Sequence, residues 1–458
     1  MQKTKALTLI ALFVMLSLTS MGCKGGSPEA QRKAQDLKLS YWTVDTREDA
    51  VRSIVQTYRA DHPNVTFDIQ VIPEDEYEQR LLEAWADDAG PDLFSIKNTW
   101  VGKYESKIEP MPGSTYLPYQ IITGTLKKEA KWVLSERTTY TPQTFVNTFV
   151  PQVATDALRD GKVYGIPLSF DSLAMYVNRD VLNNSGIIAV PRTWIPFAQA
   201  VNSMTLRDPD NNIIQSAVAM GRVDNVLYAQ DIVSLLMMQN GANMTEGESN
   251  RAVFDKSVKT PAGNTIQPGT QAALFYADFA TPGKEVYTWN QGFPSSLEAF
   301  ASGQTAIFFG YARDKRVIRD ISPALNFEIN PFPQIDGSPV KMNFASYWLE
   351  TVSKRSDNTE WAWDFIVYAT GEKRASKYIE EANLPTALRT LLASQSADDP
   401  EMEVFNQQAL TASSWYQGKQ PDVALTIFGE IIEEINAGER SNVGRLLKDA
   451  ASKINQTL

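Results

Sequence analysis

The stretch LKLSYW, residues 37–42, opens the segment that decides the fold. Its residues at 37, 39 and 41 are apolar and alternate with Lys38 and Ser40, which predicts a strand. After it, the spacing of apolar residues alternates along the chain between that of a helix and that of a strand. They predict an amphipathic helix over 51–58, a strand over 65–71, a helix over 77–85 and a buried strand over 93–96. This βαβαβ order predicts a parallel, right-handed, doubly wound sheet, whose ligands bind outside the carboxyl ends of the strands.

The rest of the chain continues the alternation after one interruption. Residues 103–145 are rich in Pro, Gly, Thr and Lys, and predict an irregular excursion on the first domain. A second strand-helix series begins near Gly161. Residues 295–298 have the spacing of a capping box that opens a helix. Extended segments at 165–177 and 344–352 would suit a chain that crosses between two lobes.

Composition excludes several classes of function. The 458 residues carry 54 acidic against 43 basic side chains, a net charge of −11, which argues against general nucleic-acid binding. The single Cys excludes an internal disulfide and a zinc-thiolate cluster. The single His argues against Ser-His-Asp and Cys-His catalysis and excludes metal sites built from several His residues. We therefore expect no cofactor and no metal site, whereas 10 Trp and 17 Tyr are plentiful.

The amino terminus has the pattern of an export signal. Residues 1–22 combine a short basic region with an apolar run too short to span a bilayer comfortably. Ser-Met-Gly-Cys, ending at Cys23, resembles the lipobox of bacterial lipoproteins, which implies lipid attachment to the Cys23 thiol. Residues 23–36 would then be a flexible tether. The alternative is a conventional cleaved signal with an incidental cysteine.

Several short motifs carry a family resemblance. They stand in the expected order across residues 37–458: AGPDLF (89–94), GKVYGIP (161–167), MYVNRDVL (175–182), FASGQTAIF (300–308), WAWDFI (361–366) and NLPT (383–386). Together they resemble solute-binding proteins of ABC importers, in the carbohydrate-binding branch related to maltose-binding protein. The sequence departs from that pattern in the longer segment 103–145 and in Asn383, where glycine is commoner.

The resemblance implies a two-lobed α/β fold of the type II periplasmic-binding-protein kind. The lobes would be 37–170 plus 342–388 and 171–341 plus 389–458, closing over a ligand by hinge motion. It further implies that the protein captures a sugar or oligosaccharide and delivers it to ABC permease subunits. We expect a monomer outside the cytoplasm whose only membrane contact is its lipid anchor, and no catalytic residue.

A sugar site needs flat aromatic faces for the apolar ring faces and polar groups for the hydroxyls. Candidates follow from their positions at strand ends, at the crossings and at places that match family contact positions. They are Trp42, Asp45, Asn98, Trp100, Asp171, Tyr228, Tyr311, Arg313, Trp348 and Trp415.

Each candidate also has a structural interpretation. A Trp at a strand end often packs at the rim of a core, and Asp45 could instead cap the helix that follows it. Trp85, Trp361 and Trp363 have helical packing spacings, so we interpret them as core, and His62 as a surface residue in a turn.

Three other functions stay open at the level of sequence. A glycan-active enzyme would need a pair of carboxylates in the cleft, and the sequence offers no convincing pair. A sensor or adhesin could use the same fold without transport. A non-sugar solute is a third possibility, although Asp45 and Asp171 with few cations besides Arg313 disfavour an anion.

Overall fold

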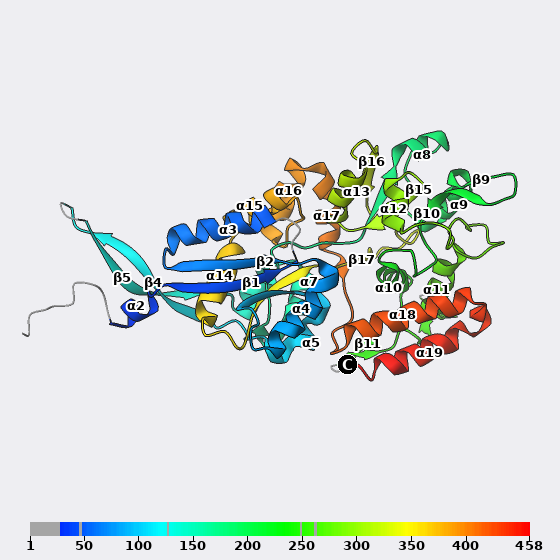
Figure 1. Ribbon diagram of the computed structural model, residues 1–458. Helices are drawn as coiled ribbons and strands as arrows, with labels where there is room; N and C mark the ends of the chain where they lie inside the picture. The colour runs from blue at the N-terminus through cyan, green and yellow to red at the C-terminus, as the bar shows by residue number, and fades with distance from the viewer. Residues whose placement is uncertain (1–27, 45–47, 126–127, 248–249, 261–262) are drawn as a thin grey trace, which may run out of the picture.

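The structure is a computed structural model that describes residues 28–44, 48–125, 128–247, 250–260 and 263–458. It contains two main sheets, of four and five strands, each flanked by helices (Figure 1). From residue 28 to 163 the elements are α2 (Pro28–Lys33), β1 (Leu37–Thr43), α3 (Glu48–Asp61), β2 (Val65–Val71), α4 (Glu74–Ala86), β3 (Leu93–Lys97), η1 (Asn98–Trp100), α5 (Val101–Tyr104), η2 (Glu105–Lys107), β4 (Ser114–Thr123), β5 (Glu129–Thr138), α6 (Pro142–Thr148), α7 (Pro151–Ala157), β6 (Leu158–Arg159) and β7 (Lys162–Val163).

The remaining elements complete the second sheet, return to the first sheet and end in helices. From residue 174 to 344 they are β8 (Ala174–Asn178), α8 (Arg179–Asn184), α9 (Trp194–Met204), β9 (Leu206–Arg207), β10 (Ile213–Val218), α10 (Ala229–Gln239), β11 (Thr245–Glu246), β12 (Arg251–Ala252), β13 (Val258–Lys259), β14 (Thr265–Ile266), α11 (Pro268–Asp278), α12 (Ser296–Ala301), β15 (Thr305–Gly310), α13 (Asp314–Ile321), β16 (Phe327–Asn330) and β17 (Asn343–Phe344). Then follow β18 (Trp348–Val352), α14 (Thr359–Ala369), α15 (Glu372–Ala382), η3 (Arg389–Leu391), α16 (Leu392–Asp398), α17 (Pro400–Ala409), β19 (Ala412–Ser413), α18 (Pro421–Asn436), η4 (Glu439–Asn442) and α19 (Val443–Ile454).

The first sheet has the order β18-β3-β1-β2. Strand β1 lies parallel to both β2 and β3, with Leu37 opposite Val65 and Tyr41 opposite Leu93. The βαβαβ unit predicted from periodicity is therefore present. Strand β18 joins it from far along the chain and runs antiparallel to β3, which places Trp348 opposite Lys97.

The second sheet has the order β16-β8-β15-β10-β9. Only β10 and β15 pair in parallel, whereas β8 runs antiparallel to both β15 and β16. The capping box predicted at residues 295–298 is present, because the side chain of Ser295 accepts from the amide of Glu298 and the Glu298 carboxylate accepts from Ser295. It begins α12, which precedes the fully buried strand β15.

Extended chain segments connect the two sheets and lie side by side. Ile166 forms an antiparallel bridge with Glu350, and the amide of Leu173 donates to the Phe344 carbonyl at 2.9 Å. A Cβ on Gly165 would lie 2.9 Å from Leu349 Cβ, so the close approach of the two segments depends on glycine at this position.

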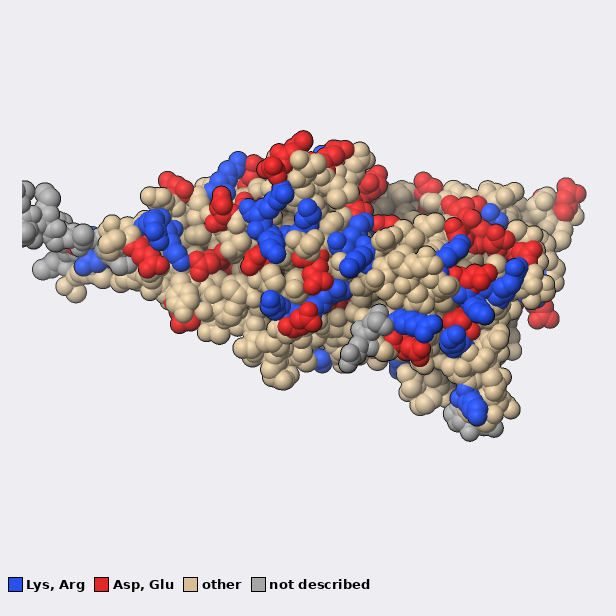
Figure 2. Space-filling view, turned by 90° about the horizontal axis from the view of Figure 1, so that it is seen from below, with Lys and Arg blue, Asp and Glu red and all other residues tan. Residues whose placement is uncertain are grey.

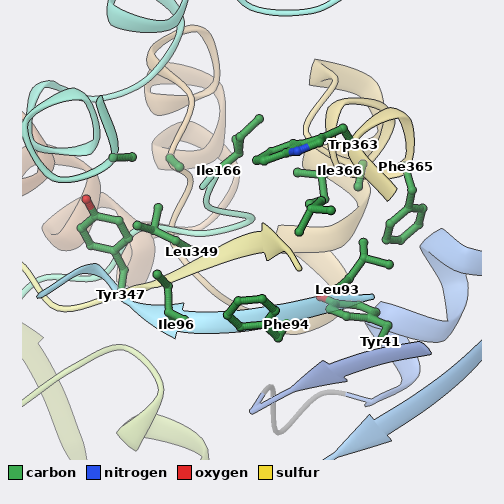
Figure 3. Packing of buried hydrophobic residues seen from close by; sticks show 14 of the residues in the cluster. Tyr41, Leu93, Phe94, Ile96, Ile166, Tyr347, Leu349, Trp363, Phe365 and Ile366 are labelled. Atoms are coloured by element: carbon green, nitrogen blue, oxygen red, sulfur yellow. The ribbon is translucent and has the colours of Figure 1, made fainter. Parts of the chain in front are cut away.

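Two large hydrophobic clusters correspond to the two sheets. The first draws on residues 39–170 and 345–412, and Figure 3 shows Phe94 of β3 and Leu349 of β18 within it. The second draws on residues 173–344 and 416–454. Trp85, Trp361 and Trp363 are 7%, 5% and 0% exposed, which confirms their interpretation as core residues.

The excursion over 103–145 is more regular than predicted. It contains the antiparallel pair β4–β5, with ten residues in each strand. The prediction of an irregular segment was wrong because much of this ribbon lies clear of the cores, so its sequence lacks the alternation that marks a half-buried strand. The proline inside β4, Pro118, strengthened the false signal.

Two other findings concern the amino-terminal region and the single histidine. Helix α2 lies within the segment expected as a tether, buries Ala30 and contacts β4 and β5. Residues 1–22 and Cys23 lie outside the described residues. His62, interpreted from sequence as a surface residue, is 1% exposed, because Tyr119 and Trp361 from distant parts of the chain pack against its ring.

One face of the molecule carries charged residues of both signs, interspersed with one another. Figure 2 shows Lys and Arg mixed with Asp and Glu along the face that it presents. On that face the acidic and basic residues are therefore not separated into one acidic and one basic region.

Candidate functional site

A cavity of about 640 Å³ lies where the first sheet meets elements of the second lobe. Its first-lobe wall is formed at the carboxyl ends of β1 and β2 and at the start of α4, as expected for a doubly wound sheet. Its other walls come from the crossing segments, from α13 and from the end of α15. The volume falls within the range of pockets that hold small ligands.

Asp171 and Arg313 form the polar centre of this cavity. The Asp171 carboxylate accepts from the amide of Ala312 at 2.9 Å and from the amide of Arg313 at 3.3 Å. The Arg313 guanidinium lies 3.9 Å from the same carboxylate. Because Asp171 belongs to a crossing segment and Arg313 to the loop before α13, these contacts tie the crossing to the second lobe.

The protonation of Asp171 is sensitive to its surroundings. Burial raises the pKa of this carboxyl to about 7, although Arg313 and the amide of Ala312 favour its ionised form. A carboxyl group with a pKa in this range can accept a hydrogen bond when ionised and can donate one when protonated.

Two tyrosines hold Arg313 in place. Its guanidinium lies 4.3 Å from the ring centre of Tyr311 and 5.4 Å from that of Tyr228. The hydroxyl of Tyr311 donates to Asp231 at 2.7 Å, and that of Tyr228 donates to Asp314 at 2.9 Å. Both predicted tyrosines therefore support the site from behind Arg313 and do not line the cavity.

Tyr228 also carries backbone strain. Its φ is 60°, in the left-handed region that costs a non-glycine residue about 1–2 kcal/mol. Such strained residues concentrate at ligand-binding sites, where the surrounding contacts hold them. Asn383, which lines the cavity, has a φ of 53° at the end of α15. Asparagine tolerates this conformation well, which explains how it replaces the commoner glycine.

Trp348 supplies an aromatic surface to the cavity, which Tyr347 and Tyr378 also line. It is half-buried on β18, with its ring 5.8 Å from that of Trp100 in an edge-to-face arrangement. The Lys97 ammonium lies 5.7 Å from the Trp348 ring centre and 5.4 Å from that of Trp100. Trp100 is itself buried, so it positions Trp348 and does not line the cavity.

Helix α13 brings three further cations to the cavity, which the sequence analysis missed. They are Lys315, Arg316 and Arg319. Lys315 pairs with Glu401 at 2.8 Å, and the Arg319 guanidinium lies over the ring of Phe327. Within the described part of the chain, Arg316 has no ion-pair or hydrogen-bond partner. The signal was present in the sequence, since Arg313, Arg316 and Arg319 recur at the three-residue spacing of one helix face.

Comparison with known proteins identifies the family. A family model described as bacterial extracellular solute-binding protein matches residues 45–375. The chain belongs to this family. The solute-binding proteins of this family act outside the cytoplasm, and the fold class predicted from sequence is confirmed by the solved structures that it resembles.

Individual relatives are distant. The melibiose/raffinose/stachyose-binding protein MelE of Bacillus subtilis is 20% identical over 84% of this chain and 82% of its own. A putative binding protein of Brucella abortus is 23% identical over 31% of this chain, and the match spans only 28% of the length of that relative.

Among solved structures, a cyclic alpha-maltosyl-1,6-maltose binding protein from Arthrobacter globiformis matches with a TM-score of 0.68 and 16% identity. That match covers 92% of this chain and 99% of the other. UgpB from Mycobacterium tuberculosis, solved with glycerophosphocholine, matches with a TM-score of 0.69 and 13% identity over 92% of this chain and 98% of its own.

In this solute-binding protein, three predicted residues line the cavity: Asp171, Arg313 and Trp348. Three others, Asn98, Trp415 and Trp42, lie outside its lining and have partners elsewhere. Asn98 is buried and donates to Asp156 at 2.9 Å, and the Trp415 indole donates to Ser234 at 3.1 Å. Trp42 packs against the first core. Asp45 lies outside the described residues.

The carboxylates of the cavity are each engaged by protein groups. Glu350 accepts from the hydroxyls of Tyr41 and Ser95, both at 2.8 Å. Glu74 pairs with Lys97 at 2.8 Å. Sequence reasoning missed both residues, because Glu350 points inward from a crossing strand whose partners are more than 250 positions away.

Two kinds of feature are missing from the described residues. They contain no group of three or more His, Cys, Asp or Glu side chains placed to hold a metal ion. They also contain no helix with the length and apolarity needed to cross a membrane.

Proposed function

We propose that this solute-binding protein captures a sugar or oligosaccharide between its lobes and delivers it to an ABC permease. The observation that carries the proposal is the cavity of about 640 Å³ that brings the half-buried Trp348 together with Asp171 and Arg313. An aromatic face suits the apolar face of a sugar ring, and the charged pair suits its hydroxyl rim. Family membership and the sugar-binding relative MelE support the same assignment.

The placement of the polar groups suggests how binding would lead to closure. Glu74 and Trp348 belong to first-lobe elements, whereas Arg313 and Arg316 belong to the second lobe. A ligand that contacts both sets favours the closed arrangement, because each contact is lost when the lobes separate. A permease could then distinguish loaded from empty protein.

The protein would be a monomer anchored by lipid on Cys23 of the mature chain. The lipobox-like sequence before Cys23 supports this part of the proposal, and the alternative is a cleaved signal with an incidental cysteine. Mass spectrometry of the mature protein would distinguish these alternatives, because a lipidated chain would begin at Cys23 and carry the additional mass of a diacylglycerol group.

We further propose that the cavity binds without catalysis. A glycosidase needs one carboxylic acid and one free carboxylate on either side of the scissile bond. Here Glu350 is held by two hydroxyls, Glu74 by Lys97, and Asp171 by backbone amides and Arg313. Incubation of the bound glycan with the protein should leave it unhydrolysed.

A second candidate ligand is an anionic solute such as a phosphodiester. The cation-poor cleft expected from sequence is not what the structure has, since Lys315, Arg316 and Arg319 join Arg313 at the cavity. Arginine is well suited to phosphate and carboxylate groups. Glycerophosphodiesters and uronic-acid sugars therefore belong in the same screen.

The decisive test is a calorimetric screen of the mature protein against neutral oligosaccharides and these anionic solutes. Arg313→Ala should weaken binding of the ligand at least about tenfold, because it removes charge-assisted hydrogen bonds. Arg80→Ala is the matched control: Arg80 is a half-exposed arginine on α4 that pairs with Glu76 away from the cavity, and its loss should leave affinity unchanged. If folded protein bound nothing in the screen, the proposal would fail.

Transport and sensing predict different phenotypes for the same binding event. A strain lacking this protein should lose uptake of the ligand if the protein serves a permease. If uptake persists and only a transcriptional response to the ligand is lost, the protein is a sensor.

A further inference from the structure

The outer half of the β4–β5 hairpin, residues 120–123 and 129–132, stands clear of the hydrophobic cores. Its strands pair only with each other among the described residues, and the ribbon extends from the first lobe away from the second (Figure 1). Ile121 and Ile122 are 41% and 67% exposed, and beside them Trp132 is half-buried and belongs to no hydrophobic cluster. Exposed apolar groups gathered in this way mark an interaction surface.

The hairpin is fixed firmly at its base. The Arg137 guanidinium pairs at 3.0 Å with Asp364, a fully buried residue of α14. The hydroxyl of Thr115 also donates to Asp364, at 3.4 Å. Lys33 of α2 donates to the Tyr116 carbonyl at 2.8 Å and to Glu360 at 2.7 Å. The ribbon therefore projects in a defined direction.

Its outer half has the composition of a membrane interface. By the strand register Ile122 shares a face with Trp132, while Ile121 lies opposite Lys131 on the other face. Tryptophan and lysine are favoured at the boundary between headgroups and acyl chains. The outer edges of both strands carry unpaired backbone groups, which are costly in hydrocarbon. Contact at the depth of the headgroups suits the Trp and Lys side chains, and it leaves the unpaired backbone groups of the strand edges in contact with water.

A lipid anchor on Cys23 would place a membrane at the same end of the molecule. Helix α2 begins at Pro28 and packs on β4 and β5. Cys23 precedes Pro28 by five residues, which span at most about 18 Å when extended. The four outer residues of each hairpin strand extend about 14 Å. An anchor at Cys23 therefore brings a bilayer within reach of the hairpin.

We propose that the outer half of the β4–β5 hairpin is a second membrane contact, which rests at the level of the lipid headgroups beside the anchor. The inference rests on the proposed lipid anchor for its geometry. A permease loop and a second copy of this chain are other possible occupants. The membrane is favoured because the chain that leads to the anchor enters the fold against this ribbon.

The test supplies the anchor chemically, so it does not depend on native lipidation or on ligand binding. Cys23 is the single cysteine of the chain, so the mature protein can be coupled through it to vesicles that carry a maleimide lipid. Phosphatidylcholine and phosphatidylglycerol with brominated acyl chains then quench any Trp that reaches the interface. The difference in emission between the native chain and Trp132→Phe isolates Trp132.

We expect brominated lipid to quench the emission of Trp132, and the Ile121→Ser/Ile122→Ser variant to lose that quenching while keeping its melting temperature. Ile188→Ser/Ile214→Ser is the matched control, since these isoleucines are 91% and 58% exposed in the second lobe, and quenching should persist. Absence of Trp132 quenching in the native chain would overturn the proposal. So would quenching that survives in the hairpin variant. If quenching is absent and the hairpin variant loses uptake or changes oligomeric state, the surface serves a protein partner.

Discussion

Acidification should charge His62 only at unusually low pH. Its ring is 1% exposed, its two nitrogens lack hydrogen-bond partners among the described residues, and Arg137 lies nearby. Burial in the first place, and Arg137 in the second, lower the pKa of His62 from 6.5 to about 4. The Asp364 carboxylate lies 3.8 Å from Nε2 of His62, but it already pairs with Arg137, whose charge disfavours a protonated ring.

The sign of the effect on stability follows from proton binding. Between pH 6.5 and about 4 the unfolded chain binds a proton at His62 that the folded chain does not. As far as His62 is concerned, the free energy of unfolding is therefore highest above pH 6.5, and it decreases as the pH falls toward 4. A shift of this size corresponds to at most about 3 kcal/mol.

Because His62 is the single histidine, proton NMR can follow its imidazole resonance alone. The midpoint of that titration should lie near 4 in the folded protein. Urea unfolding across the same range should show a smaller loss of stability in His62→Gln than in the native chain. The comparison of slopes removes the contribution of titratable groups that lie far from His62. A midpoint at or above 6.5, with equal slopes in both chains, would refute the reasoning.

Two further predictions concern the cavity and the base of the hairpin. Trp348→Ala should lower the affinity for the ligand by about tenfold while Trp100 stays in place, because the stacking face is lost. Calorimetry measures this, and an unchanged affinity would remove Trp348 from the site. Asp364→Ala should lower the free energy of unfolding by about 3 kcal/mol, because Arg137 and Tyr58 lose a buried partner. Urea titration tests it, and a loss under half that size would mean that the ion pair contributes little.

The elements set by local periodicity could be predicted from the sequence. The βαβαβ unit over residues 37–96 and the capping box at Ser295 rest on spacings within a few residues, and both are present. The position of Asp171 in a crossing segment also placed it beside a cleft before any geometry was known. These features depend on neighbours in sequence, which is why a single chain reveals them.

Features set by distant partners could not be predicted in this way. Asn98 and Trp415 stand at positions suited to a cleft, yet Asp156 and Ser234 hold their side chains elsewhere. His62 looked like a turn residue because nothing near it in sequence indicates the Trp361 ring that covers it. The cations of α13 differ, since their helical spacing was visible and was overlooked.

The measurement that tests the central claim most directly is a crystal structure of the mature protein with the ligand found in the screen. We predict that the ligand lies in the cavity between the lobes, with a sugar ring against Trp348 and polar groups within hydrogen-bond distance of Arg313 and Asp171. Ligand bound outside that cavity, or in contact with one lobe only, would contradict capture by lobe closure.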